Sequence, residues 1–258
     1  DISRQQIIEI ADAYTQKKFC FLGSSAQRYT HIPWHTDFRL QQQNSNTDVT
    51  FDNTSFYVDL SVQQGYTDAF VKDIKVPWEL SRFQYLYVLG NAYEHTHQQS
   101  YVHTFQRYVT DWLDNNPYLC GINWQCPMEV GIRAINWIVA WEFFKDDTYI
   151  PVSFRERFIG SLHDHMCYLE NNWEFYDSRT NNHYLSNLVA YLYLCWFFGD
   201  LSGIQKKSAW VVQEILREFE KQVFTEGTSY EGSTNYHCLV TELFYHAYLL
   251  LQEMNITV

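Results

Sequence analysis

Two polar runs stand directly before strongly apolar stretches, and both contain side chains that can donate or accept protons. The first is Asn-Asn-His at 181–183, and the second is Tyr-Glu-Gly-Ser-Thr-Asn-Tyr-His at 230–237. Asn, Ser and Thr at such places are common helix caps. A cap explains one polar residue in each run. It leaves His183, Tyr236 and His237 as candidates for acid–base chemistry, although a single tyrosine or histidine is more often structural.

Two further polar clusters lie at 73–84 and 121–133, again beside expected helix starts. Five of their residues could bind a sugar ring or an acidic group: Lys75, Trp78, Arg82, Trp124 and Arg133. Tryptophan stacks on flat, weakly polar faces, and arginine binds carboxylates with two parallel hydrogen bonds. Each arginine could equally form an ion pair with the glutamate that precedes it by three or four residues, Glu79 or Glu129. Both tryptophans could also belong to the core.

The composition narrows the class of protein. The chain has 258 residues and a formal charge of -12, from 18 Lys+Arg against 30 Asp+Glu, which argues against a nucleic-acid partner. Aromatic residues make up 18 % of the sequence, enough for a large core and for a cleft that stacks on sugars. The longest nearly uncharged stretch, 185–198, is shorter than the roughly 20 apolar residues of a membrane span, so no membrane partner is expected.

The six cysteines contain no CxxC pair, so the sequence predicts no zinc site. Cys167, Cys195 and Cys238 lie in apolar helical patterns and are expected to be free thiols. The first residue is Asp1, and a leader could already have been removed. The compartment therefore stays open, with the periplasm or the exterior favoured over the cytoplasm.

Apolar residues recur at helical spacing through most of the chain. The pattern predicts helices at 3–19, 78–95, 98–114, 128–145, 153–172, 182–199, 205–224 and 234–253. The exception is 27–72, which is rich in Gln, Asn, Thr and Asp, and in which 56–62 alternates weakly like a short strand. Long helices joined by short loops pack as antiparallel neighbours. Such hairpins can form a bundle, a solenoid or a closed toroid, and periodicity does not choose among these.

Taken in order, the polar segments resemble the N-terminal domain of the heparinase II/III family of polysaccharide lyases. The matching blocks are Trp-His-Thr-Asp-Phe at 34–38, Asp-Ile-Lys-Val-Pro-Trp-Glu-Leu-Ser-Arg-Phe-Gln at 73–84, Asn-Pro at 116–117, Gly-Ile-Asn-Trp at 121–124, Met-Glu-Val at 128–130, Arg-Ala-Ile-Asn-Trp at 133–137, Asn-His-Tyr-Leu-Ser-Asn-Leu at 182–188 and the run at 230–237. They extend from about residue 20 to about residue 250. The resemblance implies an all-α fold, an incomplete (α/α) toroid of antiparallel helical hairpins spanning 1–258. It also implies a following β-sandwich domain, absent from this sequence, so we expect the chain to be a fragment.

The resemblance further implies β-elimination on an anionic, uronic-acid-containing polysaccharide. Asn182 matches the residue that neutralises the uronate carboxylate, a task that His183 could share. Tyr236 matches the tyrosine that protonates the leaving oxygen in the family. An ordinary phenol is protonated near neutral pH, so it can act as this acid. The family's base is a histidine of the β-sandwich domain, and His183 and His237 are only local candidates for a substitute. No cofactor is required, because amides and imidazoles can supply the hydrogen-bond donors.

The remaining candidates are assigned to substrate binding. Tyr230 would stack on sugars with Trp78 and Trp124, and His237 would lie beside them. Attraction of a polyanion to a chain of charge -12 would depend on a local group such as Lys75, Arg82 and Arg133, or on the following domain. The same charge slightly favours less charged uronans over highly sulfated heparin, although a sulfated glucosaminoglycan, alginate and an exopolysaccharide are all compatible with the sequence.

Two other functions stay open at this level. An α/α-toroid glycoside hydrolase would need two facing carboxylates, for which Glu79, Glu129, Glu226 and Glu231 are the candidates. A non-catalytic carbohydrate-binding or polysaccharide-biosynthesis-associated protein would keep the cleft without the reaction.

Overall fold

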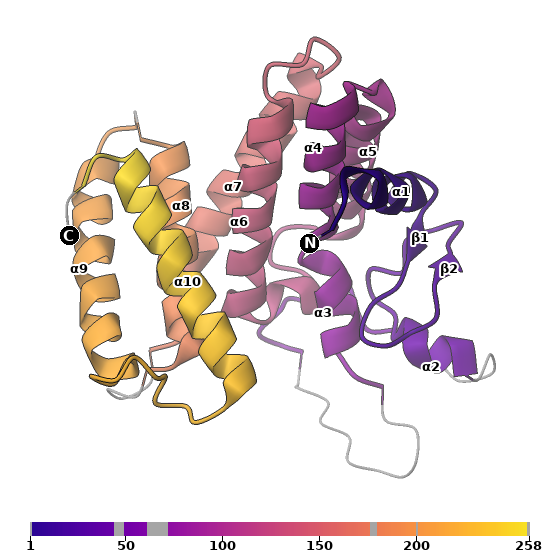
Figure 1. Cartoon of the computed structure of the whole chain (residues 1–258). Coiled ribbons are helices and arrows are strands. Elements are labelled where there is room, and N and C mark those ends of the chain that lie inside the picture. Colours follow the sequence, from indigo (N-terminus) through magenta and orange to yellow (C-terminus); the bar gives the residue numbers. More distant parts are fainter. Residues whose placement is uncertain (1, 44–48, 61–71, 176–179, 200, 257–258) are drawn as a thin grey trace.

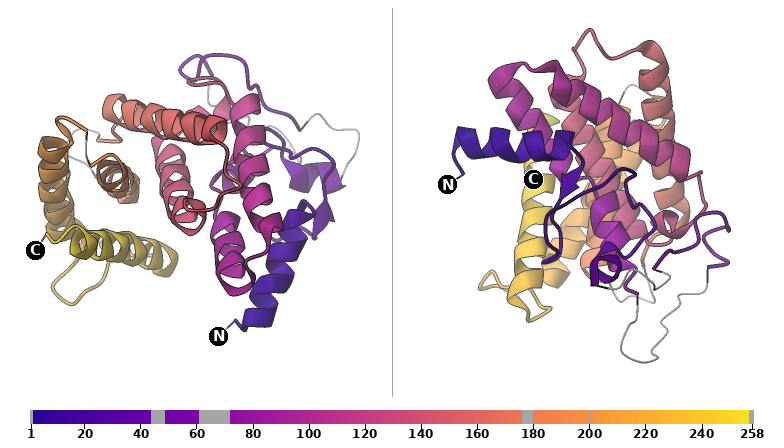
Figure 2. Two further views of the ribbon diagram at one scale, coloured as in Figure 1. Left: turned by 90° about the horizontal axis from the view of Figure 1, so that it is seen from above. Right: turned by 90° about the vertical axis from the view of Figure 1, so that its right-hand side faces the viewer.

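The structure, a computed structural model, describes residues 2–43, 49–60, 72–175, 180–199 and 201–256. Its elements, in chain order, are α1 (Arg4–Thr15), β1 (Lys18–Phe19), β2 (Gln27–Arg28), α2 (Phe38–Gln43), α3 (Lys75–Ser81), α4 (Tyr85–Thr96), α5 (Gln99–Asn115), the 3-10 turn η1 (Ile122–Trp124), α6 (Pro127–Phe144), α7 (Val152–Asn171), α8 (Asn182–Phe197), α9 (Ile204–Gln222) and α10 (Thr234–Glu253). Figures 1 and 2 show the long helices following one another as antiparallel neighbours around an open arc. The fold is thus the expected all-α, incomplete (α/α) toroid.

The middle of the arc is formed by α6 and α8, whose residues are buried almost all the way round. A Cβ atom on Gly131 of α6 would lie 3.0 Å from the Cβ of Ala190 in α8, so small residues allow the two helices to approach closely. Both helices have a high proportion of apolar residues, as expected for helices enclosed by neighbours. This central pair fixes the positions of the first turns of α6 and α8, where the polar runs begin.

The amphipathic pattern predicted for 98–114 is confirmed in α5. Tyr101, Phe105, Tyr108, Val109 and Trp112 are all fully buried. In α9, apolar residues at intervals of four would form one face, but Val211 and Ile215 are buried, whereas Phe219 is 49 % exposed.

The single helix predicted at 78–95 is two helices, α3 and α4. Phe83 lies between them with a φ of 63°, a left-handed conformation that a helix interior does not contain. Its ring is fully buried and stacks on Trp34 at a centroid distance of 5.2 Å. Burial of this aromatic ring opposes the local strain, so tertiary packing breaks a pattern that looks continuous in sequence.

The predictions for the first 60 residues were less accurate. The helix expected at 3–19 ends at Thr15, and Lys18–Phe19 pairs in antiparallel register with Gln27–Arg28. No strand forms at 56–60, where Phe56 makes one bridge to Cys120, and 61–62 lie outside the described residues. Within the described part, no helix is long and apolar enough to cross a membrane.

Candidate functional site

The first turns of α8 and α10 lie at the same end of the molecule, and a carboxylate links α8 to the loop before α10. The Nδ2 atom of Asn182 lies 2.9 Å from each carboxylate oxygen of Glu231, and its backbone N donates to Oε1 at 3.1 Å. Asn182 is only 3 % exposed, and its Oδ1 is buried without a partner among the described residues. The helix begins here because the side chain of Asn181 accepts a bond from His183 N, the cap considered from the sequence. Asn182 is thus a fixed amide that already binds a carboxylate.

The loop that carries Glu231 is held against the start of α8 by two further contacts. The hydroxyl of Tyr230 donates to the carbonyl of Thr180 at 2.7 Å. Nε2 of Gln222 donates to the carbonyl of Asn181 at 3.2 Å. Figure 1 shows this gold connection between α9 and α10 at the same end of the molecule as α3. Tyr230 therefore contributes to loop placement, and about 39 % of it remains exposed.

Tyr236 lies in the first turn of α10 and is 48 % exposed. Its hydroxyl has no hydrogen-bond partner in the part of the chain that the structure describes, so it is free to meet a ligand. His237 lies differently, because its Nδ1 accepts a bond from the backbone N of Ser229 at 3.3 Å. The two neighbouring residues of the run thus divide into a free phenol and a half-buried imidazole tied to the loop.

His183 belongs to a second polar group at this end. Its Nδ1 lies 2.8 Å from Oε1 of Glu174, a residue that is 8 % exposed. The hydrogen bond to Glu174 raises the pKa of His183 above its usual value of 6.5, burial opposes the rise, and the charges of Glu174, Glu129 and Glu231 add to it. Asn187 fixes the carboxylate, because its Nδ2 donates to Oε2 at 3.1 Å and its Oδ1 accepts from Glu174 N at 2.9 Å.

Arg82 is bound by two glutamates and is not available as a free cation. Its Nε and Nη2 donate to the two oxygens of Glu129 at 2.7 Å each, and its Nη1 donates to Glu79 at 2.8 Å. These carboxylates raise the pKa of Arg82 further against the effect of burial. The ion pair between Arg82 and Glu79 considered from the sequence is therefore found. Glu129, considered as the partner of Arg133, binds Arg82 instead.

Arg133 and Trp124 require a correction. Arg133 is fully buried, with its Nε donating to Nε2 of His165 at 2.9 Å and its guanidinium 4.2 Å from the ring centroid of Trp112. Burial lowers its pKa to about 9. Trp124 is 1 % exposed and packs on His165. Neither side chain reaches a surface that a polysaccharide could touch, so both stabilise the core instead.

The two remaining candidates lie on α3. Lys75 is exposed at the first residue of the helix. Trp78 is half-buried, and its Nε1 donates to the carbonyl of Ile122 at 2.8 Å. Of the three cations expected to attract a polyanion, Lys75 is the exposed one, and it forms no ion pair with any described residue.

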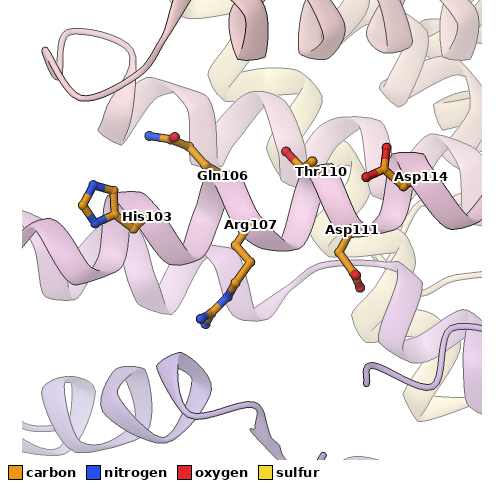
Figure 3. Close-up of a pocket in the computed structure, with 6 residues that line it drawn as sticks. All are labelled: His103, Gln106, Arg107, Thr110, Asp111 and Asp114. Atoms are coloured by element: carbon orange, nitrogen blue, oxygen red, sulfur yellow. The ribbon is translucent and has the colours of Figure 1, made fainter. Parts of the chain in front are cut away.

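A surface depression lies elsewhere, along α5. Figure 3 shows its lining: His103, Gln106, Arg107, Thr110, Asp111 and Asp114. Several of these residues are engaged in structural contacts: Arg107 donates to Thr15 O at 2.8 Å, and Asp111 accepts from Trp34 Nε1 at 2.8 Å. None of the site candidates from the sequence lines this depression, so it is distinct from the site at α8 and α10.

The structure thus gathers Asn182, His183, Tyr230, Tyr236 and His237 at one end of the toroid. Glu174 was not identified from the sequence, because it follows a helix as a single acid in Asn-Asn-Trp-Glu-Phe at 171–175 and no spacing marks it. Glu231 was considered from the sequence only as a candidate carboxylate of a glycoside hydrolase.

The open ring of antiparallel helical hairpins places the chain among the (α/α)-toroid proteins. More specifically, it belongs to the heparinase II/III family, since the family model described as "Heparinase II/III N-terminus" matches residues 30–257. A heparin-sulfate lyase of Pedobacter heparinus is 23 % identical over 193 residues, covering 72 % of this chain and 28 % of the relative. A heparin-sulfate lyase of Bacteroides stercoris is 22 % identical, covering 67 % of this chain and 28 % of the relative. The chain therefore spans little more than a quarter of these relatives.

Solved structures agree on the fold. The crystal structure of heparan sulfate lyase HepC from Pedobacter heparinus has a TM-score of 0.70 at 21 % identity, covering 99 % of this chain and 35 % of that one. A heparinase III, the BT4657 gene product, has a TM-score of 0.66 at 19 % identity, covering 98 % of this chain and 36 % of that one.

Proposed function

We propose that this chain is the helical domain of a polysaccharide lyase that cleaves a uronic-acid-containing polysaccharide by β-elimination. The family supports a lyase at the level of reaction class. The observation that carries the assignment to this end of the molecule is the binding of the Glu231 carboxylate by the Asn182 amide. A site that binds an internal carboxylate with an uncharged donor has the chemistry needed to bind a uronate.

In the proposed reaction, a uronate carboxylate takes the place of Glu231 on Nδ2 of Asn182. Hydrogen bonding lowers the negative charge on this carboxylate, which stabilises the enolate formed when the C5 proton leaves. The electrons of the C5–H bond form the C4–C5 double bond, and the C4–O4 bond breaks. Tyr236, with its free hydroxyl, donates the proton to O4.

The base that takes the C5 proton is not assigned within this chain. His183 and His237 are both tied to neighbouring groups, through Glu174 and Ser229 respectively. We propose that the base is a histidine of a β-sandwich domain outside this sequence, as the resemblance implies. The complete site then requires both domains.

The substrate class follows from the relatives and from the local charge. The relatives are named for heparin sulfate, whereas this end of the toroid contains Glu79, Glu129, Glu174 and Glu231, and Arg82 is bound to two of them. These four carboxylates repel a densely sulfated polysaccharide. We therefore propose a uronan of low sulfation as the preferred substrate.

The test uses the protein that carries this chain together with its β-sandwich domain. A lyase produces a C4–C5 unsaturated uronate, so ultraviolet absorbance should rise on incubation with alginate, heparan sulfate or an exopolysaccharide. Tyr236→Phe should abolish that rise and leave binding nearly intact, whereas Tyr245→Phe, on the exposed surface of the same helix, should leave both unchanged. New reducing ends without absorbance would indicate a hydrolase and contradict the proposal. Binding without turnover would indicate a carbohydrate-binding protein.

A further inference from the structure

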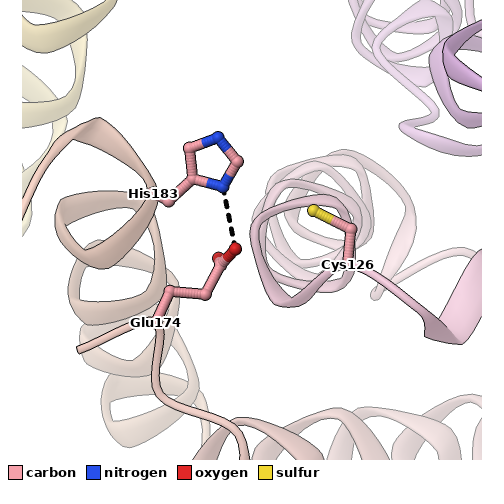
Figure 4. Close-up of side chains that lie close together, drawn as sticks. All are labelled: Cys126, Glu174 and His183. Carbon is pink, nitrogen blue, oxygen red and sulfur yellow. Dashed lines mark hydrogen bonds and ion pairs between the residues drawn. The ribbon is translucent and has the colours of Figure 1, made fainter. Parts of the chain in front are cut away.

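Three different metal-binding side chains meet beside the first turn of α8. They are Cys126, the residue before α6, Glu174, in the connection after α7, and His183. One donor atom from each lies within 4.8 Å of the others (Figure 4). The three residues come from separate segments, so a search of the sequence for closely spaced cysteines does not find them.

The positions of these donors fit a small, tetrahedral metal ion. With bonds of 2.0–2.3 Å, two ligands on one zinc ion lie about 3.3–3.8 Å apart. The pair His183 Nδ1 and Glu174 Oε1, now 2.8 Å apart, would open slightly, and the thiol would move inward within its 4.8 Å limit. Because His183 and Cys126 are both partly exposed, small side-chain rotations are enough.

The surroundings support a bound cation independently of the distances. Glu174 is buried, and Asn187 holds it with two hydrogen bonds, so Oε1 stays directed at His183. Such an outer partner, which orients a ligand, is typical of metal sites. The charge of Glu129 also acts on both Cys126 and His183. Glu129 is already paired with Arg82, so a divalent cation would mainly offset the charge of Glu174.

Cys126 is the N-cap residue of α6, and the backbone amides of Met128 and Glu129 lie beside its thiol. A coordinated metal removes the thiol proton outright, and the two amides would then stabilise the thiolate. The thiolate and the Glu174 carboxylate together match the two charges of the cation.

We propose that Cys126, Glu174 and His183 bind zinc or a similar thiolate-accepting divalent ion, with a fourth position open to water or a ligand. Thiolate together with imidazole selects such ions over calcium and magnesium, which prefer oxygen ligands. This inference does not depend on the lyase function, because it concerns metal binding by the chain alone.

Cobalt(II) is the probe for the test, since a thiolate on tetrahedral cobalt gives visible and near-ultraviolet bands. The metal-free chain should develop these bands at one equivalent of cobalt and lose them on addition of zinc. Cys126→Ser should remove the thiolate band and weaken binding by about tenfold or more, since loss of an outer-shell contact alone costs about that much. Cys120→Ser is the matched control, a partly exposed free cysteine outside the cluster, and it should behave like the wild type.

Absence of the band in the wild-type chain would overturn the proposal, as would a band that persists in Cys126→Ser. If Cys126→Ser does not keep its helical circular dichroism, peptide mapping of the wild-type chain decides. Zinc should then protect Cys126 from alkylation and leave Cys120 reactive, and equal alkylation with and without zinc would refute the site.

Discussion

The amide of Asn182 binds both carboxylate oxygens of Glu231 at 2.9 Å, so the amide proposed to bind a substrate carboxylate already binds one from the protein itself. Glu231 lies in the loop before α10, and Asn182 lies in the first turn of α8. A ligand carboxylate that takes this amide must displace Glu231 or share the donor with it. The loop is thus part of the proposed site and competes with the ligand.

The first prediction follows from that competition. Glu231→Gln keeps an oxygen acceptor for Asn182 and removes the negative charge, so a uronate oligosaccharide should bind up to about tenfold more tightly. Titration calorimetry with an alginate oligosaccharide measures the change. Glu226→Gln, at an exposed position of the same loop, makes the same change of net charge and should have a much smaller effect. An equal gain in affinity in both variants would show that net charge, and not the contact with Asn182, controls binding.

The second prediction concerns the ion pair between Arg82 and Glu129. The Glu129 side chain is 7 % exposed, so Arg82→Leu leaves an almost buried carboxylate without its bidentate partner. We expect the free energy of unfolding in urea to fall by about 3 kcal/mol or more. Arg157→Leu breaks an exposed pair with Asp114, whose side chains are 47 % and 58 % exposed, and should cost less than about 1 kcal/mol. Similar losses in both variants would contradict the expected dependence on burial.

The third prediction is a pH dependence of stability that arises from His165. Burial and the charge of Arg133 hold the pKa of His165 well below 6.5, and Arg133 donates to its Nε2, so the folded chain keeps this residue neutral. Below about pH 6.5 the unfolded chain takes up a proton that the folded chain does not, and stability falls by about 1.4 kcal/mol per pH unit. This contribution is fully present above the unfolded pKa and is lost progressively as the pH falls toward the folded pKa.

Urea unfolding at several pH values between about 7 and 5.5 measures the slope. His165→Gln should reduce this slope by the amount that corresponds to about one bound proton. His103→Gln, at an exposed position, is the control and should change the slope much less. An unaltered slope in His165→Gln would show that other groups cause the dependence.

The fourth prediction concerns Gly121, which precedes the η1 turn. Its φ is 77°, and an added Cβ would lie 2.7 Å from the backbone Cα of Asn53, an atom that cannot simply rotate away. Gly121→Ala should therefore destabilise the chain by about 2–4 kcal/mol. Gly160→Ala, in α7 with open space around it, should instead stabilise by about 0.5–1 kcal/mol. Thermal unfolding followed by circular dichroism distinguishes the two, and a neutral Gly121→Ala would contradict the backbone argument.

Where the sequence repeats at helical spacing over several turns, the predicted elements are confirmed. The helices expected at 98–114, 128–145 and 234–253 appear as Gln99–Asn115, Pro127–Phe144 and Thr234–Glu253. Long amphipathic patterns are reliable because each helix must bury its apolar face. The short elements α2, β1 and β2 were missed, because two to six residues carry too little periodicity to stand out.

The candidate site was likewise predicted only in part from the sequence. The order and type of the residues placed Asn182 and Tyr236 in segments that match motifs of the family. The structure brings those two segments to one end of the toroid. Arg133 is buried among aromatic rings, whereas Tyr236 is exposed. Residue type could not predict this difference, since each residue lies in a helix with recurring apolar residues. Burial depends on which face of a helix meets its neighbours.

By itself, the sequence determined the long helices, the negative net charge and the family to which the chain belongs, because these depend on local periodicity, composition and ordered motifs. Only the tertiary structure decided which charges are paired. Arg82 meets Glu129 across 47 residues, Asn182 meets Glu231 across 49, and Cys126, Glu174 and His183 meet from three segments. Such contacts arise when helices pack side by side, and the spacing of residues along one helix does not encode them.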